Sequence, residues 1–116
     1  LMTAEALRAA VLAKRQGISV RVINMPTIKP LDEEIILTAA RECHNIITVE
    51  EHNVIGGLGE AVCSLLSEKM PTPVRRIGVQ DKFGHSGPAA EVLRDYGLTA
   101  ENIAATVREM VYPGTV

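Results

Sequence analysis

The stretch ITVEEHNVIGGLGEAVCSLLSE, residues 47–68, joins a strand pattern, a glycine-rich turn and a helix pattern. Its glycines raise the question of a nucleotide site, because Gly57 and Gly59 match the first two glycines of the dinucleotide-binding pattern G-x-G-x-x-G. The apolar run 74–79 follows as a possible second strand, and Asp81 then stands near the place of a ribose-binding acid. These positions favour a bound nucleotide.

Three other features of the sequence argue against a nucleotide. Val62 stands where the third glycine of the pattern belongs, and the segment Glu50–Ile55 separates the strand from the turn. The pattern also belongs to the first strand of a domain, whereas here another helix and strand precede it. We therefore interpret Gly56 and Gly57 as a sharp turn that leaves the first amides of a helix open to solvent or to a neighbouring chain.

The composition indicates one α/β domain. Of 116 residues, 47% are apolar but only 3% are aromatic, so the core must consist of Val, Ile, Leu and Ala, as in a parallel sheet between helices. A net charge of −2, with acids and bases interspersed, argues against nucleic acid and anionic membranes as partners. No apolar stretch approaches the ~18 residues of a membrane span.

The two cysteines, Cys43 and Cys63, each lie within an apolar helical pattern and have no nearby C-x-x-C partner. Buried structural thiols in a reducing cytoplasm fit this arrangement better than a disulfide or a metal pair. We therefore predict a cytoplasmic protein without a metal site. No signal peptide is recognisable, and the start at Leu1 favours a fragment of a larger protein.

Helix and strand patterns alternate along the chain, with Asp32 and Thr99 as expected N-caps and Gly17 and Asn45 as expected helix ends. The first helix has Leu7 and Val11 on one face. In the second helix, the expected buried stripe consists of Ile35, Ile36, Ala39, Ala40 and Cys43. The predicted helices cover residues 4–16, 33–44, 58–68, 88–96 and 100–110, the predicted strands cover 18–25, 46–50 and 74–79, and residues 111–116 form a loose tail.

This order predicts a single domain over residues 1–116 with a three-layer α/β/α sandwich and a mostly parallel sheet. Three strands flanked by five helices make a thin sheet, and the chain opens on a helix. We therefore expect a further strand that belongs before Leu1.

Two groups of polar residues are candidates for chemistry. Glu50, Glu51 and His52 follow a strand at its carboxyl end, where α/β proteins bind ligands, although charged loop residues that bind backbone amides or a partner surface have the same pattern. The loop 80–87 carries Asp81, Lys82, His85 and Ser86 before a helix start; these residues suit either a phosphate or a plain Ser86 N-cap. No self-sufficient catalytic set is present.

Four short motifs resemble the C-terminal domain of transketolases. They are TIKPLD at 27–32, VEEH at 49–52, GGLGEAV at 56–62 and GLTAENI at 97–103, and the resemblance extends over about residues 4–110. Deoxyxylulose-phosphate synthases and the beta subunits of 2-oxoacid dehydrogenases carry similar pieces. The motif GLTAENI favours transketolases among these families, including the split form in which this domain ends a separate subunit.

The resemblance implies an assembly role. In that family, thiamine diphosphate and its magnesium ion lie between two other domains, so this chain is expected to bind neither and to hold no catalytic residue. Its implied partners are the thiamine-binding domains or subunit of the parent transketolase and a second copy of itself in a homodimer. The surface expected to serve the subunit interface or a regulator consists of Glu50, Glu51, His52, Ile55, Gly56, Gly57 and Leu58, with Ile55 and Leu58 buried by the other chain.

Two alternative functions stay open from the sequence. One is a stand-alone regulatory domain that binds a small anion through the amides of Gly56–Gly59 or Gly84–Gly87. The other is the C-terminal domain of a deoxyxylulose-phosphate synthase.

Overall fold

A computed structural model describes residues 2–25, 30–53, 57–79 and 99–112. These residues contain four helices and two strands, in the order α1 (Met2–Lys14), α2 (Glu33–Cys43), β1 (Ile46–Asn53), α3 (Leu58–Lys69), β2 (Val74–Val79) and α5 (Ala100–Val111). The predicted helix over 88–96 and the loop 80–87 lie outside the described residues. None of the described helices has both the length and the apolar character that a bilayer-spanning segment requires.

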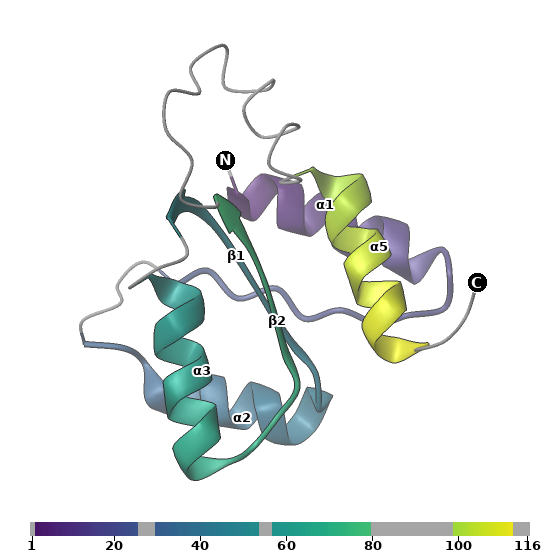
Figure 1. Cartoon of the computed structure of the whole chain (residues 1–116). Helices are drawn as coiled ribbons and strands as arrows, with labels where there is room; N and C mark the ends of the chain where they lie inside the picture. Colours follow the sequence, from purple (N-terminus) through teal and green to yellow (C-terminus); the bar gives the residue numbers. More distant parts are fainter. Residues whose placement is uncertain (1, 26–29, 54–56, 80–98, 113–116) are drawn as a thin grey trace.

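The two strands are parallel neighbours, and helices cover both faces of the sheet that they form. Helices α1 and α5 lie together on one face, and α2 and α3 lie on the other (Figure 1). The pairing begins with Ile46 opposite Val74 and stays in step to Glu50 opposite Gly78. The predicted three-layer α/β/α arrangement is thus confirmed for the described part of the chain.

The predicted strand over 18–25 is wrong, since this segment forms no ladder with any described residue. It keeps the exposure pattern of a strand: Ile18 is buried, Val20 and Val22 are half-buried, and the residues between them are exposed. Arg21 ties it to α2 through a 2.7 Å hydrogen bond from Nη1 to the Glu42 carboxylate, which raises the pKa of the Arg21 guanidinium. Residues 18–22 thus have the side-chain pattern of a strand, but the segment pairs with no hydrogen-bonded neighbour among the described residues.

The buried face of α1 is also not the predicted one. Leu7 and Val11 are 53% and 54% exposed, whereas Ala9 and Ala13 are buried. The small alanine side chains allow α1 to pack closely against α5 and the sheet, which decides which face turns inward. Leu7 and Val11 are left as an exposed apolar pair one turn apart.

Helix α2 begins as predicted and ends one residue earlier. The Asp32 carboxylate accepts a hydrogen bond from the Ile35 amide at 3.3 Å, which confirms the N-cap. His44 rather than Asn45 takes the left-handed conformation that ends the helix, with φ 69°. Cys43 is exposed, which contradicts its predicted burial, and Ile35 is 40% exposed.

An apolar core forms on each side of the sheet, and the core on the α1 and α5 side consists of two clusters. On the α1 and α5 side, the main buried residues are Ala9, Ile77, Ala100, Ile103 and Ala104. Between α2 and α3, they are Ile36, Ala40, Val62, Leu65 and Leu66. These cores include Val62, Leu65 and Leu66 of α3, and Ile103 and Val107 of α5.

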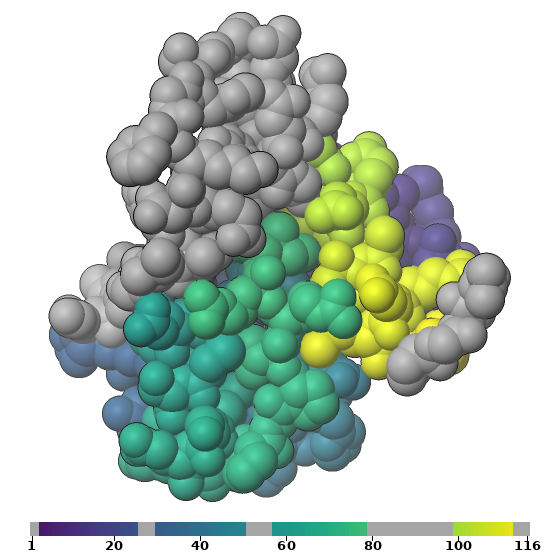
Figure 2. Space-filling model, in the orientation of Figure 1, coloured from purple at the N-terminus to yellow at the C-terminus, as the bar shows by residue number. Residues whose placement is uncertain are grey.

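Strand β2 lies at the surface between α3 and α5, and one of its side chains contacts α5. Figure 2 shows β2 exposed between these two helices. Arg75 on β2 lies 3.6 Å from the Glu109 carboxylate on α5, and both side chains are about half-exposed or more. An ion pair in water contributes little to stability, so the two apolar cores carry most of the packing energy.

Leu66 is the test of the α2–α3 core, because its side chain is 1% exposed. We expect Leu66→Ala to lower the free energy of unfolding by about 2–5 kcal/mol, since it removes buried methyl groups and leaves a cavity. Leu7→Ala is the matched control at an exposed helical position and should change it by less than about 0.5 kcal/mol. Urea denaturation of both variants measures the difference, and equal losses would contradict the assigned core.

Candidate functional site

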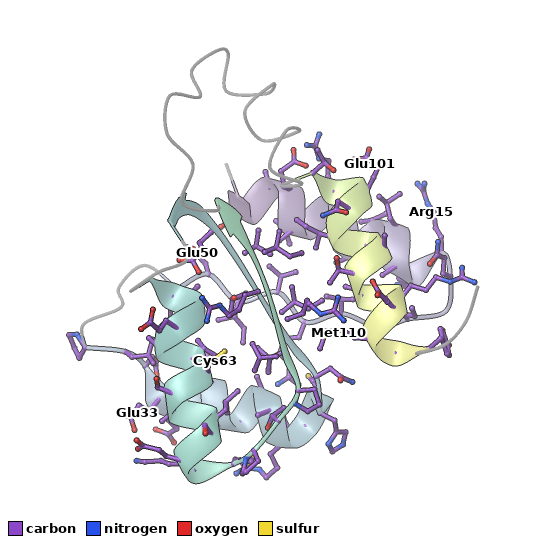
Figure 3. All side chains as sticks on the ribbon, viewed as in Figure 1. Arg15, Glu33, Glu50, Cys63, Glu101 and Met110 are labelled. Atoms are coloured by element: carbon purple, nitrogen blue, oxygen red, sulfur yellow. The ribbon has the colours of Figure 1, made fainter. Side chains whose placement is uncertain are left out.

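The carboxyl end of β1 meets the amino end of α3 at the side chain of Glu50. This carboxylate is only 7% exposed. Its Oε1 accepts a hydrogen bond from the Leu58 amide at 2.9 Å, and its Oε2 accepts one from the Gly59 amide at 2.8 Å. Figure 3 shows Glu50 beside the start of α3. One side chain of the strand therefore binds two of the first amides of the helix that follows it.

This arrangement corrects the expectation that the helix start is open. Free amides at a helix amino terminus attract phosphate because the N–H groups and the helix dipole both favour negative charge. Here the Glu50 carboxylate supplies that negative charge from within the chain. A phosphate would have to displace a buried carboxylate, so the amides of Leu58 and Gly59 do not form an anion cradle.

Gly59 allows the helix to approach the sheet this closely. A Cβ atom at Gly59 would lie 2.9 Å from Thr48 Oγ1 and 3.0 Å from both Arg76 Cγ and Glu50 Oε2. These distances are shorter than the contacts that a side chain normally tolerates. Gly57, the N-cap residue, has φ −95°, a value open to any residue. The glycine that the packing requires is thus Gly59, whereas the sequence interpretation assigned the turn to Gly56 and Gly57.

Of the other predicted site residues, three lie in described elements and two lie outside the described residues. Glu51 and His52 belong to β1, where the pairing with β2 becomes irregular between Glu50 and Asn53. Ile55 and Gly56 lie outside the described residues. Leu58 is half-buried and packs against the α2–α3 core of its own chain, which departs from the expectation that another chain alone buries it.

A second buried carboxylate holds the start of α5. Glu5 on α1 is 8% exposed, and its Oε2 accepts a hydrogen bond from the Ala100 amide at 2.7 Å. Arg8 forms an ion pair with the same carboxylate. The predicted N-cap Thr99 completes the helix start, because its hydroxyl accepts from the Asn102 amide at 3.2 Å. Sequence reasoning missed Glu5, since no local pattern links residues that lie 95 positions apart.

The remaining polar and thiol groups of the described part do not form a reactive cluster. No three His, Cys, Asp or Glu side chains among these residues are placed to hold a metal ion. Cys43 is exposed at the end of α2, and Cys63 is half-buried on α3. Thr48 Oγ1 is buried beside Gly59 and has no hydrogen-bond partner among the described residues. The corner around Glu50 is therefore built to hold α3 on the sheet.

Comparison with known proteins gives a consistent family match. The family model described as "Transketolase, C-terminal domain" matches residues 1–103. The 6-deoxy-6-sulfo-D-fructose transketolase subunit SqwH of Clostridium sp. (strain MSTE9) is 43% identical over 95% of this chain and 34% of its own length. The 1-deoxy-D-xylulose-5-phosphate synthase of Heliobacterium modesticaldum is 44% identical over 94% of this chain and 17% of its own length.

A solved structure supports the same match. The protein titled "Split gene transketolase, inactive beta4 tetramer" superposes with a TM-score of 0.87 at 48% sequence identity, covering 93% of this chain and 35% of that chain. The chain thus spans about a third of the length of two of these relatives and about a sixth of the length of the synthase.

Gly59→Ala tests the close contact at the Glu50 corner. Alanine is the better helix former by about 1 kcal/mol, but its methyl group would collide with Thr48 and Glu50. We expect the free energy of unfolding to fall by about 1 kcal/mol or more. In a Thr48→Ala background, which removes the nearest atom, Gly59→Ala should cost less, and a double-mutant cycle from urea denaturation measures that difference. A stability gain from Gly59→Ala alone would contradict the contact.

Proposed function

The chain belongs to the transketolase C-terminal domain family, and on this premise we propose that it is the C-terminal domain of a transketolase-type, thiamine-diphosphate-dependent ketol transferase. Its role there is to pack against the other domains and to assemble subunits, without taking part in the chemistry. The observation that supports this proposal is that two buried carboxylates bind the amides of helix starts. Glu50 stands toward the carboxyl end of β1, where α/β proteins bind ligands, and both Glu50 and Glu5 are bonded to helix amides.

The similarities to known proteins support the proposal that this domain does not select the substrate of the enzyme. A subunit named for a sulfosugar transketolase and a synthase named for deoxyxylulose phosphate are 43% and 44% identical to this chain. A domain that selected the substrate would be expected to resemble one of these proteins more than the other. The near-equal identities fit a domain whose conserved task is packing.

Thiamine diphosphate and its magnesium ion do not fit the described residues. A diphosphate bound at the start of α3 would meet the Glu50 carboxylate, whose charge is of the same sign. The described residues also hold no group of side chains suited to a metal ion. We propose that in the parent enzyme the cofactor is held by other domains or by another subunit.

The second candidate, a stand-alone domain that binds a small anion, has less support. The amides of Leu58 and Gly59, part of its first proposed site, are already bonded to Glu50. Its second proposed site, Gly84–Gly87, lies outside the described residues.

The proposed partners are the thiamine-binding domains or subunit of the parent enzyme and a second copy of this chain, in the cytoplasm. The structural relative whose title names an inactive tetramer supports an assembling role. We propose that the contact between copies involves Ile55, and that it is weak because this chain spans about a third of that relative.

Calorimetric titration tests the non-catalytic role. We expect no micromolar binding when thiamine diphosphate and Mg²⁺ are titrated into this chain, and no ketol transfer from xylulose 5-phosphate by the chain alone. An intact transketolase, titrated in the same buffer, is the positive control. Micromolar binding to this chain would contradict the proposal.

Sedimentation velocity tests the association. We expect a concentration-dependent monomer–dimer equilibrium that Ile55→Glu shifts toward monomer by about tenfold or more in dissociation constant, because a charge would have to be desolvated. Ile35→Glu, at a 40% exposed position of α2, is the matched control and should leave the equilibrium unchanged. Circular dichroism verifies that both variants keep their helices. A strict monomer, or a dimer indifferent to Ile55→Glu, would show that the contact surface is elsewhere.

A further inference from the structure

Helix α1 is apolar on the face that it turns away from the core. Its inner face includes the buried Ala9 and Ala13, whereas Leu7 and Val11 on the outer face are both more than half exposed. Leu7 and Val11 lie four residues apart, so their side chains are neighbours on the helix surface. Ala4, which is also exposed, precedes Leu7 on the same face. The outer face therefore carries a continuous apolar stripe about two turns long.

The other described helices have mainly polar outer faces. Their exposed residues are Glu33, Glu34, Ile35, Arg41, Glu42 and Cys43 on α2, Glu60, Ser64, Ser67, Glu68 and Lys69 on α3, and Glu101, Asn102, Ala105, Arg108, Glu109 and Val111 on α5. A helix that is apolar all round is normally buried all round. In α1, the described part of the chain covers one apolar face and leaves the other in solvent. This second face is suited to contact with another surface.

Cations border the apolar stripe on both sides. At about 100° per residue, Lys14 lies about 20° to one side of Leu7. On the other side, Arg15 and Arg8 lie about 40–60° beyond Val11. Arg15 follows α1 but keeps its helical geometry, because its amide donates a hydrogen bond to the Val11 carbonyl at 3.2 Å. Its side chain extends away from the sheet (Figure 3).

The charge of this face has one sign. Glu5, the acidic residue of α1, is buried on the opposite side, where it binds the start of α5. Its ion pair with Arg8 leaves 67% of the Arg8 side chain exposed. Lys14 and Arg15 are exposed, and neither forms an ion pair with a described residue. A surface that covers this face is therefore complementary if it places carboxylates opposite these cations.

We propose that the outer face of α1 docks a helix of a partner protein. The apolar stripe of that helix covers Leu7 and Val11, and its flanking Asp and Glu side chains meet Lys14 and Arg15. A helix suits this stripe because a single row of side chains packs into the groove of a facing helix. The inference deepens the proposed assembly role and rests on it, and it adds a contact surface apart from Ile55.

A second copy of this chain and an anionic membrane are weaker occupants of the face. Two copies of α1 packed on each other would bring cations together, and like charges on facing helices repel. Helices that lie on membranes bury a broad apolar face, often with Trp or Phe. Here the exposed apolar side chains are those of Leu7, Val11 and Ala4. Both occupants are separate outcomes of the test below.

Titration of a helical peptide into the isotope-labelled chain, followed by NMR, tests the proposal. The probe is a synthetic peptide of about 18 residues, long enough to form a helix, with a leucine stripe and glutamates on both sides of it. The matched control peptide has lysine in place of every glutamate. We expect saturable shifts of the α1 amides with the glutamate peptide and a dissociation constant about tenfold or more higher for the lysine peptide. Added salt should weaken binding of the glutamate peptide.

Variants of α1 locate the contact. The double variants Leu7→Gln with Val11→Gln and Lys14→Glu with Arg15→Glu should each weaken binding of the glutamate peptide by about tenfold or more. Glutamine and glutamate are good helix formers, so α1 should persist, and circular dichroism verifies this. Ile35→Gln, at an exposed apolar position of α2, is the matched control and should leave the affinity unchanged.

Four results would overturn the proposal. The absence of saturable shifts would mean that α1 does not dock such a helix. Equal affinity for both peptides, or affinity indifferent to the α1 variants, would mean that this face does not select an acidic partner. Binding to phosphatidylcholine–phosphatidylserine vesicles that Leu7→Gln with Val11→Gln abolishes would assign the face to a membrane. Self-association in sedimentation that the same variant abolishes would assign it to a second copy. The titration uses neither cofactor nor Ile55 variants, so its failure is distinguishable from failure of the proposed function.

Discussion

The hydrogen bonds from the Leu58 and Gly59 amides to the Glu50 carboxylate fix the relation between sheet and helix on which one whole layer depends. They join the last regular residue pair of β1 to the first turn of α3. Because Gly59 has no Cβ, α3 can lie close enough for both bonds to form. Once α3 starts there, its apolar stripe reaches α2, and Leu66 closes the core between the two helices.

In the layer of α1 and α5, a carboxylate also holds the start of a helix. Glu5 of α1 binds the first amide of α5, so a carboxylate again holds a helix start through a long-range contact. Buried carboxylates are costly unless they are bonded, and each of these is bonded to backbone amides. Acidic groups used in this way are not available as acids, bases or metal ligands. This engagement supports the packing and assembly role that we propose for the chain.

The described sheet has only two strands and depends on the helices that cover it. Two paired strands have little stability without covering helices, and here four helices cover a layer that β1 and β2 only partly fill. The side chains of 18–22 alternate in exposure as those of a strand do, but the backbone of 18–25 forms no ladder with any described residue. Local pattern therefore predicted the side-chain exposure of this segment correctly and its hydrogen bonding incorrectly.

Sequence by itself determined the elements whose signals are local. The Asp32 and Thr99 caps and the strand 74–79 depend on residues within a few positions of one another, and the structure confirms each of them. Only the tertiary structure decided which face of α1 is buried, because Ala9 and Ala13 allow a closer approach than Leu7 and Val11. It alone also decided that Glu50 and Glu5 hold helix starts and that Gly59 is the required glycine. These features are contacts between separate elements, and no local periodicity encodes which surfaces meet.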